Sequence, residues 1–439
     1  MYIEPKIYVH STNRENNIIV NGATGSVDLV NTTIAEVLNS HDNNRISEIS
    51  QEYLLQLIDS GYIINNEKEN INKAYSIYNE AINSIDKYTY VICPTMGCNL
   101  NCTYCFESNM NYSNKVMNSD MLVQIFKFIT VESSKKNIPS YIELFGGEPL
   151  LEANYNLIEE ILSFSSKNDI KIGIITNGTK LNSFFDLFKQ YKNVISVIQI
   201  TIDGIKEIHD SRRITHDGSG TFEVIEKNLL DALKLGLPIT VRINIDKVNI
   251  NGIKDIVYYL DENFAFYKNF AFYFAPVHDH KIVNNGLVDE GDIAIELDSL
   301  NINNNNGFKV LGYLRDVMKN GESNRLPCFS YCEANSENYF VFTPDGKIYG
   351  CTETIGIEEY VIGQFYPSIE EVNRNPRWCY NNILTSNQST CVDCDIALLC
   401  GGGCVLVNDN LKMKEQFCIQ QKNSIKKYFD YYIEKVGLQ

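Results

Sequence analysis

The segment CNLNCTYC at residues 98–105 places three cysteines close together: Cys98, Cys102 and Cys105. Cysteine thiolates select soft or borderline metals, namely zinc, copper(I) or the irons of iron–sulfur clusters. Structural zinc usually takes four protein ligands, often in Cys-x2-Cys pairs, and a three-cysteine run without an adjacent histidine fits that pattern poorly. A four-iron cluster held by three thiolates would leave one iron free to bind another molecule.

A second set of cysteines lies in the last third of the chain. The pattern is Cys332-x13-Gly346-x4-Cys351, then Cys391-x2-Cys394-x5-Cys400-x3-Cys404, and finally Cys418, with Cys328 as a candidate eighth ligand. Eight thiolates are enough to hold two four-iron clusters. Because Cys391-x2-Cys394 also has the spacing of a zinc knuckle, structural zinc is the alternative.

Two further cysteines and one pair of histidines are also considered as metal ligands. Cys93 lies in an apolar segment and is predicted to be a thiol of the core, whereas Cys379 receives no role. His278 and His280 have a spacing that two metal ligands can have, but they are interpreted as part of a solvated loop.

The elements that position the first cysteines begin at residue 88. Six apolar, strand-like segments alternate with helical segments, which predicts a parallel sheet; the strands fall within 88–95, 140–147, 170–178, 194–204, 238–246 and 270–277. Six units are fewer than the eight of a closed barrel, so the predicted fold is a partial (β/α)6 TIM-like barrel. Such barrels carry their chemistry at the carboxyl ends of the strands, and residues 98–105 directly follow the first strand.

The flanking regions predict two further domains around the barrel at 88–305. Residues 1–87 suggest a hairpin, helices and a final strand, hence a small winged-helix-like module followed by a helical linker. Residues 281–305 are polar and are interpreted as a connection. The domain at 306–439 holds the second cysteine set, a hairpin with an Asp-Gly turn in YFVFTPDGKIYGC, and a terminal helix over 423–436.

Composition narrows the class of protein. The net charge of -17 argues against a nucleic-acid partner, which needs a basic face. The first residues do not resemble a signal peptide and no apolar run reaches the roughly 18 residues of a membrane helix, so we expect a cytoplasmic protein without a membrane partner. In that reducing compartment the 13 cysteines are expected to bind metal rather than to form disulfides.

CNLNCTYC, with Tyr104 before its last cysteine, resembles the signature of the radical S-adenosylmethionine (SAM) superfamily. The resemblance implies a [4Fe–4S] cluster on Cys98, Cys102 and Cys105. SAM would bind its open iron and be cleaved by one electron to a 5′-deoxyadenosyl radical.

The ends of the next three strands extend the resemblance to the SAM site. LFGGEPL resembles the family's GGEP motif, in which Gly146 and Gly147 would let the backbone approach the ligand and Glu148 would accept from the SAM ammonium group. The resemblance also makes Asn177 the candidate for the ribose, and Thr201 and Arg212 the candidates for the methionine carboxylate. The alternatives are ordinary strand-end turns and, for Arg212, a surface salt bridge.

The second cysteine set resembles the SPASM domain that follows the barrel in radical SAM enzymes that modify peptides and proteins. The resemblance assigns Cys328, Cys332, Cys351 and Cys404 to one auxiliary [4Fe–4S] cluster, and Cys391, Cys394, Cys400 and Cys418 to a second. Together with the SAM cluster, the chain would then bind three [4Fe–4S] clusters.

The resemblance covers about residues 88–420 and implies an anaerobic oxidoreductase. The module at 1–87 is similar to elements that bind leader peptides of ribosomally made peptides (RiPPs), which favours a peptide maturase. This enzyme would abstract hydrogen from a precursor peptide and install a thioether or carbon–carbon cross-link. An external donor of the flavodoxin or ferredoxin type would supply electrons.

Two other functions stay open. An anaerobic sulfatase-maturating enzyme, which makes formylglycine, has the same clusters but does not need the N-terminal module. A non-catalytic iron–sulfur electron carrier or zinc scaffold would not need the GGEP motif, because it has no SAM to bind.

Overall fold

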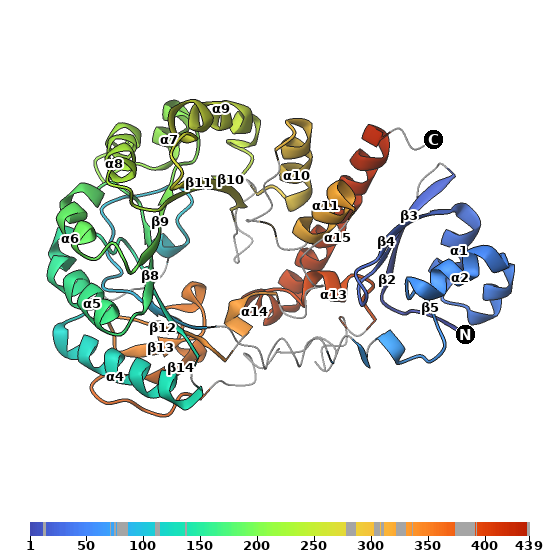
Figure 1. Cartoon of the computed structure of the whole chain (residues 1–439), viewed down its shortest axis with the longest axis horizontal. Helices are drawn as coiled ribbons and strands as arrows, with labels where there is room; N and C mark the ends of the chain where they lie inside the picture. Colours follow the sequence, from blue (N-terminus) through green and yellow to red (C-terminus); the bar gives the residue numbers. More distant parts are fainter. Residues whose placement is uncertain are drawn as a thin grey trace.

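The main domain is an open arc of strands with the connecting helices on its outer side (Figure 1). The computed structural model describes residues 1–11, 15–70, 72–73, 76, 87–109, 115–136, 138–277, 287–302, 308, 311–321, 331–335, 337–373, 391 and 393–436. The largest sheet has nine strands in the order β11-β10-β9-β8-β7-β6-β12-β13-β14. Its first six strands are parallel neighbours in chain order, which confirms the predicted partial barrel.

The barrel strands and helices alternate as the apolar segments predicted. The strands are β6 (Tyr88–Ile92), β7 (Ser140–Leu144), β8 (Lys171–Thr176), β9 (Ile195–Thr201), β10 (Ile239–Ile245) and β11 (Phe270–Pro276). The helices are α4 (Ser119–Lys136), α5 (Tyr155–Lys167), α6 (Phe185–Gln190), α7 (Lys206–Arg212), α8 (Phe222–Lys234) and α9 (Ile253–Phe264). One continuous apolar core joins the sheet to these helices.

Burial along the strands distinguishes the two faces of the sheet. In β10 the apolar Ile239, Val241, Ile243 and Ile245 are buried, whereas the polar residues between them are half-buried. Side chains of successive strand residues point to opposite faces, so one face packs against helices and the other lines the interior of the arc. The barrel interior is therefore partly polar.

The C-terminal hairpin is confirmed, and it extends the barrel sheet. Strands β12 (Tyr339–Phe342) and β13 (Lys347–Tyr349) pair antiparallel, and β14 (Val361–Gln364) follows β13. Strand β12 also pairs in parallel with β6, the first barrel strand. The hairpin thereby brings the following Cys351 to the edge of the barrel.

Two helical predictions were incomplete. The segment interpreted as a polar connection contains helix α10 (Glu290–Ser299), in which Asp289 caps the N-terminus by accepting from the Asp292 N–H. The terminal helix α15 (Leu411–Val436) begins well before residue 423, since no glycine or proline interrupts 411–422. Helix α11 (Leu311–Asn320) lies nearby, and its Arg315 forms a buried ion pair with Asp298 of α10 at 2.6 Å.

The N-terminal module has its own small core. Its antiparallel sheet is β2-β3-β4, with β2 (Ile7–His10), β3 (Asn16–Asn21) and β4 (Val27–Asn31). Strands β1 (Tyr2–Ile3) and β5 (Ile63–Ile64) form a second pair, around α1 (Thr32–Ser40) and α2 (Gln51–Asp59). Residues 43–48, between these helices, form only a short 3-10 helix. Most of the predicted linker lies outside the described residues.

The N-terminal module packs against the C-terminal domain. The ring of Tyr8 contacts Phe429 of α15, and His10 Nε2 lies 2.9 Å from Asp430 Oδ1. Figure 1 shows α15 between the barrel and the module. In the described part of the chain, no helix combines the length and apolar character needed to cross a bilayer.

Candidate active site

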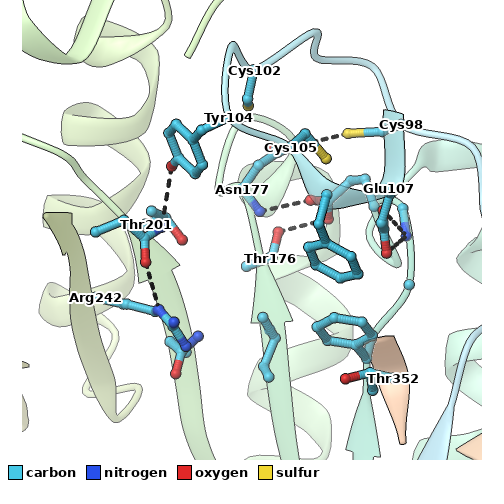
Figure 2. Close-up of a pocket in the computed structure, with 18 of the residues that line it drawn as sticks. Cys98, Cys102, Tyr104, Cys105, Glu107, Thr176, Asn177, Thr201, Arg242 and Thr352 are labelled. Carbon is cyan, nitrogen blue, oxygen red and sulfur yellow. Dashed lines mark hydrogen bonds between the residues drawn. The ribbon is translucent and has the colours of Figure 1, made fainter. Parts of the chain in front are cut away.

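Cys98, Cys102 and Cys105 lie together at the carboxyl end of the barrel. All three line a cavity of about 350 Å³, with residues from the ends and inner faces of the strands around it (Figure 2). Each of the three side chains is partly buried. The spacing in the sequence and the position after β6 therefore bring the three predicted cluster ligands to one end of one cavity.

Backbone hydrogen bonds fix the cysteine loop. The Asn101 N–H donates to the Ile214 carbonyl at 2.7 Å, and the Thr103 N–H donates to the Arg212 carbonyl at 2.9 Å. On the opposite side, the Glu148 N–H donates to the Gly97 carbonyl at 2.9 Å. Two segments that the sequence linked to SAM binding thus also hold the loop that carries the cysteines.

The two glycines of the GGEP motif make room for this loop. Gly146 and Gly147 have φ of 85° and 44°, values that favour glycine. A Cβ atom on Gly147 would lie 2.2 Å from the Gly97 carbonyl oxygen, and one on Gly146 would lie 2.7 Å from the Cβ of Cys93. The two glycines therefore lie close to other parts of the chain. Their close approach to SAM stays a prediction.

Glu148 joins the ends of β7 and β8. Its Oε1 accepts from the Thr176 hydroxyl at 2.6 Å and from the Leu150 N–H at 2.8 Å, while Oε2 accepts from the Asn177 N–H at 2.6 Å. Burial raises the pKa of Glu148, and these hydrogen bonds partly offset the increase. The carboxylate lines the cavity, so its predicted contact with the SAM ammonium remains open to test.

Asn177 contacts the cysteine loop directly. Its Nδ2 donates to Asn99 Oδ1 at 2.9 Å and lies 3.8 Å from the Sγ of Cys98. Its Oδ1 accepts from both the backbone and the hydroxyl of Thr179. Asn177 therefore orients a predicted cluster ligand, and its role at the ribose likewise stays a prediction.

The two candidates for the methionine carboxylate differ in position. Thr201 ends β9 and lines the cavity. Arg212 is almost fully buried beside the cavity, where its guanidinium pairs with Asp203 at 3.2 Å and with Asp246 at 2.7 Å. The guanidinium carbon of Arg212 also lies 4.7 Å from the ring centroid of Tyr104. The alternative considered for Arg212 was a surface salt bridge. Arg212 does form ion pairs, but they are buried.

Arg213 is a cavity residue that the sequence analysis did not select. Its NH1 donates to the Tyr104 hydroxyl at 2.6 Å, but its buried Nε finds no hydrogen-bond partner among the described residues. A buried, unpaired guanidinium N–H is costly unless an acceptor binds it. Such an acceptor would be supplied by an anionic ligand in the cavity, so the residues present fit a carboxylate-bearing cofactor.

The protonation of the cysteines also fits a metal centre. Burial, with smaller contributions from the neighbouring Glu148, Cys102 and Cys105, raises the pKa of the Cys98 thiol to about 12. Without a cation this thiol is neutral at pH 7, whereas a bound metal would deprotonate it. The three-cysteine donor set, at the mouth of a cavity that can admit a further ligand, suits a cluster with one open iron.

The inner wall of the cavity carries further polar residues that the sequence analysis missed. Glu143 of β7 and Arg242 of β10 line it, together with Gln199, which accepts from the Tyr273 hydroxyl at 2.7 Å. Burial raises the pKa of Glu143 to about 7. The signal was present in the strands, since each polar residue alternates with buried apolar ones.

The C-terminal cysteines separate into two groups. Burial raises the pKa of Cys351 well above its usual value, with further increases from Cys332 and Cys404. Burial likewise raises the pKa of Cys400, with further increases from Cys418, Cys394 and Cys391. Cys332, Cys351 and Cys404 are thus electrostatic neighbours, as are Cys391, Cys394, Cys400 and Cys418, while the assignment of these cysteines to two clusters stays a prediction.

No single-ion site accompanies these groups. Within the described part of the chain, no three cysteine, histidine or carboxylate side chains converge on one metal-ion position. A four-iron cluster instead takes one thiolate on each of several irons. The candidate eighth ligand Cys328, and likewise Cys379, His278 and His280, lie outside the described residues. Cys93 is fully buried, which confirms its prediction as a core thiol.

Comparison with known proteins gives the class. Residues 92–260 match the model of the Radical SAM superfamily. This match covers the barrel and agrees with the cysteine signature, and the matched superfamily implies an enzyme with a [4Fe–4S] cluster and SAM as its cofactors.

The relatives of this chain include maturases. A cysteine-type anaerobic sulfatase-maturating enzyme of Clostridium novyi is 25% identical over 377 residues, which span 77% of this chain and 93% of that protein. A solved structure of anSMEcpe with AdoMet and the Cp18Cys peptide has a TM-score of 0.60 at 22% identity, covering 79% of this chain and 97% of the other. Streptococcus suis SuiB bound to its precursor peptide SuiA has a TM-score of 0.51 at 16% identity, covering 94% and 98%. These structural likenesses establish the fold.

Proposed function

We propose that this chain is a radical SAM peptide maturase that recruits a ribosomally made precursor through its N-terminal module and cross-links it by a thioether or carbon–carbon bond. The observation that carries the proposal is a groove on that module, in the same chain as the cysteine-lined cavity. The extent of the structural likeness agrees, because SuiB covers 94% of the chain whereas anSMEcpe covers 79%. Residues 88–439, without the module, make up about four fifths of the sequence.

The groove lies between strand β4 and helix α2. It is a cavity of about 220 Å³ whose lining includes Leu29, Asn31, Tyr53 and Gln56. Leu29 and Tyr53 are 47% and 46% exposed, which is high for large apolar side chains. Among the described residues β4 pairs only with β3, so its other edge is open. An extended peptide can add to such an edge as a further strand and place apolar side chains in the groove.

The barrel supplies the chemistry. When bound on Cys98, Cys102 and Cys105, a [4Fe–4S] cluster with SAM supplies a 5′-deoxyadenosyl radical, which takes a hydrogen atom from the substrate. The chain's own residues orient the reactants: Asn177 and the 212–215 backbone hold the cysteine loop, and Arg213 faces the ligand.

Forming a cross-link then releases one proton and one electron. Glu143 lines the interior with a pKa of about 7, so it is placed to accept the proton. Cys328, Cys332, Cys351 and Cys404 would hold the auxiliary cluster nearer the barrel, which would supply an acceptor for the electron. An external flavodoxin- or ferredoxin-type protein supplies the electron that starts each turnover.

The second candidate is formylglycine formation in a sulfatase. The curated relative from Clostridium novyi favours it, because the likeness spans 93% of that sulfatase-maturating enzyme. In this function the N-terminal module would have no assigned substrate.

Mass spectrometry of two peptides separates the candidates. The reconstituted chain, SAM and a reductant are incubated anaerobically with Cp18Cys or with synthetic peptides from short, cysteine-containing reading frames that flank the gene. The proposal predicts loss of two hydrogen atoms from a flanking peptide and no change in Cp18Cys. Conversion of the Cp18Cys cysteine to an aldehyde, with every flanking peptide unmodified, would instead establish the sulfatase function.

A further inference from the structure

Lys6 of the N-terminal module reaches the second group of C-terminal cysteines. Its Nζ donates to the backbone carbonyls of Cys391 at 3.2 Å and of Cys394 at 3.4 Å. Lys6 is only 5% exposed, and nearly four hundred positions separate it from these cysteines in the sequence. A buried ammonium group is retained only where hydrogen bonds and opposite charges compensate its loss of water.

The module around Lys6 fits the surface of this cysteine group. The Lys6 carbonyl accepts from the Gly22 N–H at 2.9 Å, and a Cβ atom on Gly22 would lie 3.2 Å from the Cβ of Leu398. Leu398 belongs to α13 (Ala397–Cys400), the short helix that ends at Cys400. The first strands of the module therefore cover the cysteine group from outside.

Two carboxylates also face the ammonium. Glu4 is fully buried; its Oε1 accepts from the Lys6 backbone N–H at 3.2 Å, and its Oε2 accepts from the Asn70 side chain at 2.7 Å. Asp393 lies between the two cysteines in the sequence and attracts the same ammonium group. Burial raises the pKa of Glu4, which weakens its negative charge relative to an exposed glutamate. Burial also lowers the pKa of Lys6, whereas its hydrogen bonds to the two carbonyls and the nearby acidic groups favour the charged ammonium.

We propose that Lys6 is a positioning residue of the second auxiliary cluster, and that its ammonium group raises the reduction potential of this cluster. The inference rests on the proposed assignment of Cys391, Cys394, Cys400 and Cys418 as ligands. A [4Fe–4S] cluster with four thiolates is negatively charged, and reduction adds one more negative charge. A buried cation nearby stabilises the reduced form more than the oxidised form, because the attraction acts at low dielectric. The peptide-binding module thereby becomes part of an electron-transfer site.

The test is a redox titration followed by electron paramagnetic resonance. It uses the reconstituted full chain with Cys98, Cys102 and Cys105 replaced by alanine, so that only auxiliary clusters contribute. Lys6→Met removes the charge at similar length, and Lys6→Arg keeps it. Lys68→Met removes the charge of an exposed lysine elsewhere on the module and serves as the matched control.

We expect Lys6→Met to make reduction of one auxiliary cluster at least about tenfold less favourable, a shift of about 59 mV to lower potential. Lys6→Arg and Lys68→Met should stay close to the parent protein. Loss of iron in Lys6→Met but not in Lys6→Arg would also support the role of the charge. The proposal is wrong if Lys6→Met keeps the parent potential, or if Lys6→Met and Lys6→Arg lose iron alike.

A separate variant tests the cluster assignment on which the inference rests. Cys391→Ala should remove the signal of the same cluster that responds to Lys6. If the iron content and all signals survive Cys391→Ala, the ligand assignment fails, and the failure lies in the proposed cluster content rather than in Lys6.

Discussion

At the scale of single residues, two adjacent arginines have different environments. Arg212 satisfies two aspartates, whereas Arg213 faces the cavity with a buried N–H that has no partner among the described residues. Arg212 was the candidate that the family resemblance suggested, and neither residue type nor spacing distinguishes it from the adjacent Arg213. Arg212 ends α7 and Arg213 is its C-cap, so the path of the chain at the end of this helix decides which guanidinium lines the cavity.

The first prediction separates the two arginines. Arg213→Met should weaken SAM binding by at least about tenfold, because it removes a charge-assisted hydrogen bond worth about 1.5–3 kcal/mol. Arg212→Met should lower the free energy of unfolding by about 3 kcal/mol, because it leaves Asp203 and Asp246 buried without their cation. Equilibrium dialysis with SAM and chemical denaturation measure the two effects. Equal SAM affinity in the wild type and Arg213→Met would contradict the role given to Arg213.

The second prediction concerns Gly147. Gly147→Ala should destabilise the chain by at least about 2 kcal/mol and lower the iron content of the SAM-cluster site, because its Cβ would collide with the Gly97 carbonyl. Gly218 has a similarly positive φ of 84° but no atom within 4 Å of an added Cβ. Gly218→Ala therefore measures backbone strain alone, about 1–2 kcal/mol. Equal destabilisation in both variants would show that contact with the cysteine loop is unimportant.

At the scale of elements, apolar runs predicted all six barrel strands because each must be buried on the helix-covered face. The polar residues on the inner face were missed, although Arg242 and Asn244 alternate with isoleucine and valine in β10. The pairing of β12 with β6 was also missed, because two segments almost 250 residues apart give no local signal. Helix α10 was taken for a connection because the segment 281–305 around it is polar and rich in asparagine, although Ile293, Ala294, Ile295 and Leu297 are clustered within it.

The third prediction tests the groove between β4 and α2. Leu29→Asp should weaken binding of the precursor peptide by at least about tenfold, because it places a charge where an apolar peptide side chain would bind. Leu55→Asp is the control, because Leu55 is 60% exposed on the same module but does not line the groove. Fluorescence anisotropy with a labelled peptide gives both affinities. A similar loss in the two variants would indicate a general effect on the module rather than a peptide site.

At the scale of the whole molecule, the N-terminal module and the C-terminal cysteine domain are one packed unit. Tyr8, His10 and Lys6 all contact the C-terminal domain. Neither segment alone indicated this arrangement, because His10 and Lys6 look like ordinary surface residues in the sequence. The cysteine spacings were more informative about the proposed metal sites, because the ligands of one cluster must lie close together in space even when many residues separate them in the sequence.

The fourth prediction concerns cluster content. The anaerobically reconstituted chain should bind roughly twelve irons, four in each of three clusters. Replacing Cys98, Cys102 and Cys105 by alanine should remove about four irons and abolish SAM cleavage. Cys351→Ala should change the electron paramagnetic resonance signal of one auxiliary cluster, and Cys400→Ala should change the signal of the other. Stoichiometric zinc with little iron would contradict the assignment of the C-terminal cysteines and favour the structural-zinc alternative.

The most direct test of the central claim follows one hydrogen atom from peptide to cofactor. The reconstituted chain is incubated anaerobically with SAM, a reductant and a uniformly deuterated peptide from a flanking reading frame, and the mass of the 5′-deoxyadenosine is measured. If the enzyme abstracts hydrogen from the peptide, 5′-deoxyadenosine should gain one deuterium, and Leu29→Asp should reduce this transfer more than Leu55→Asp does. Formation of 5′-deoxyadenosine without deuterium, at the same rate with and without each flanking peptide, would contradict the account.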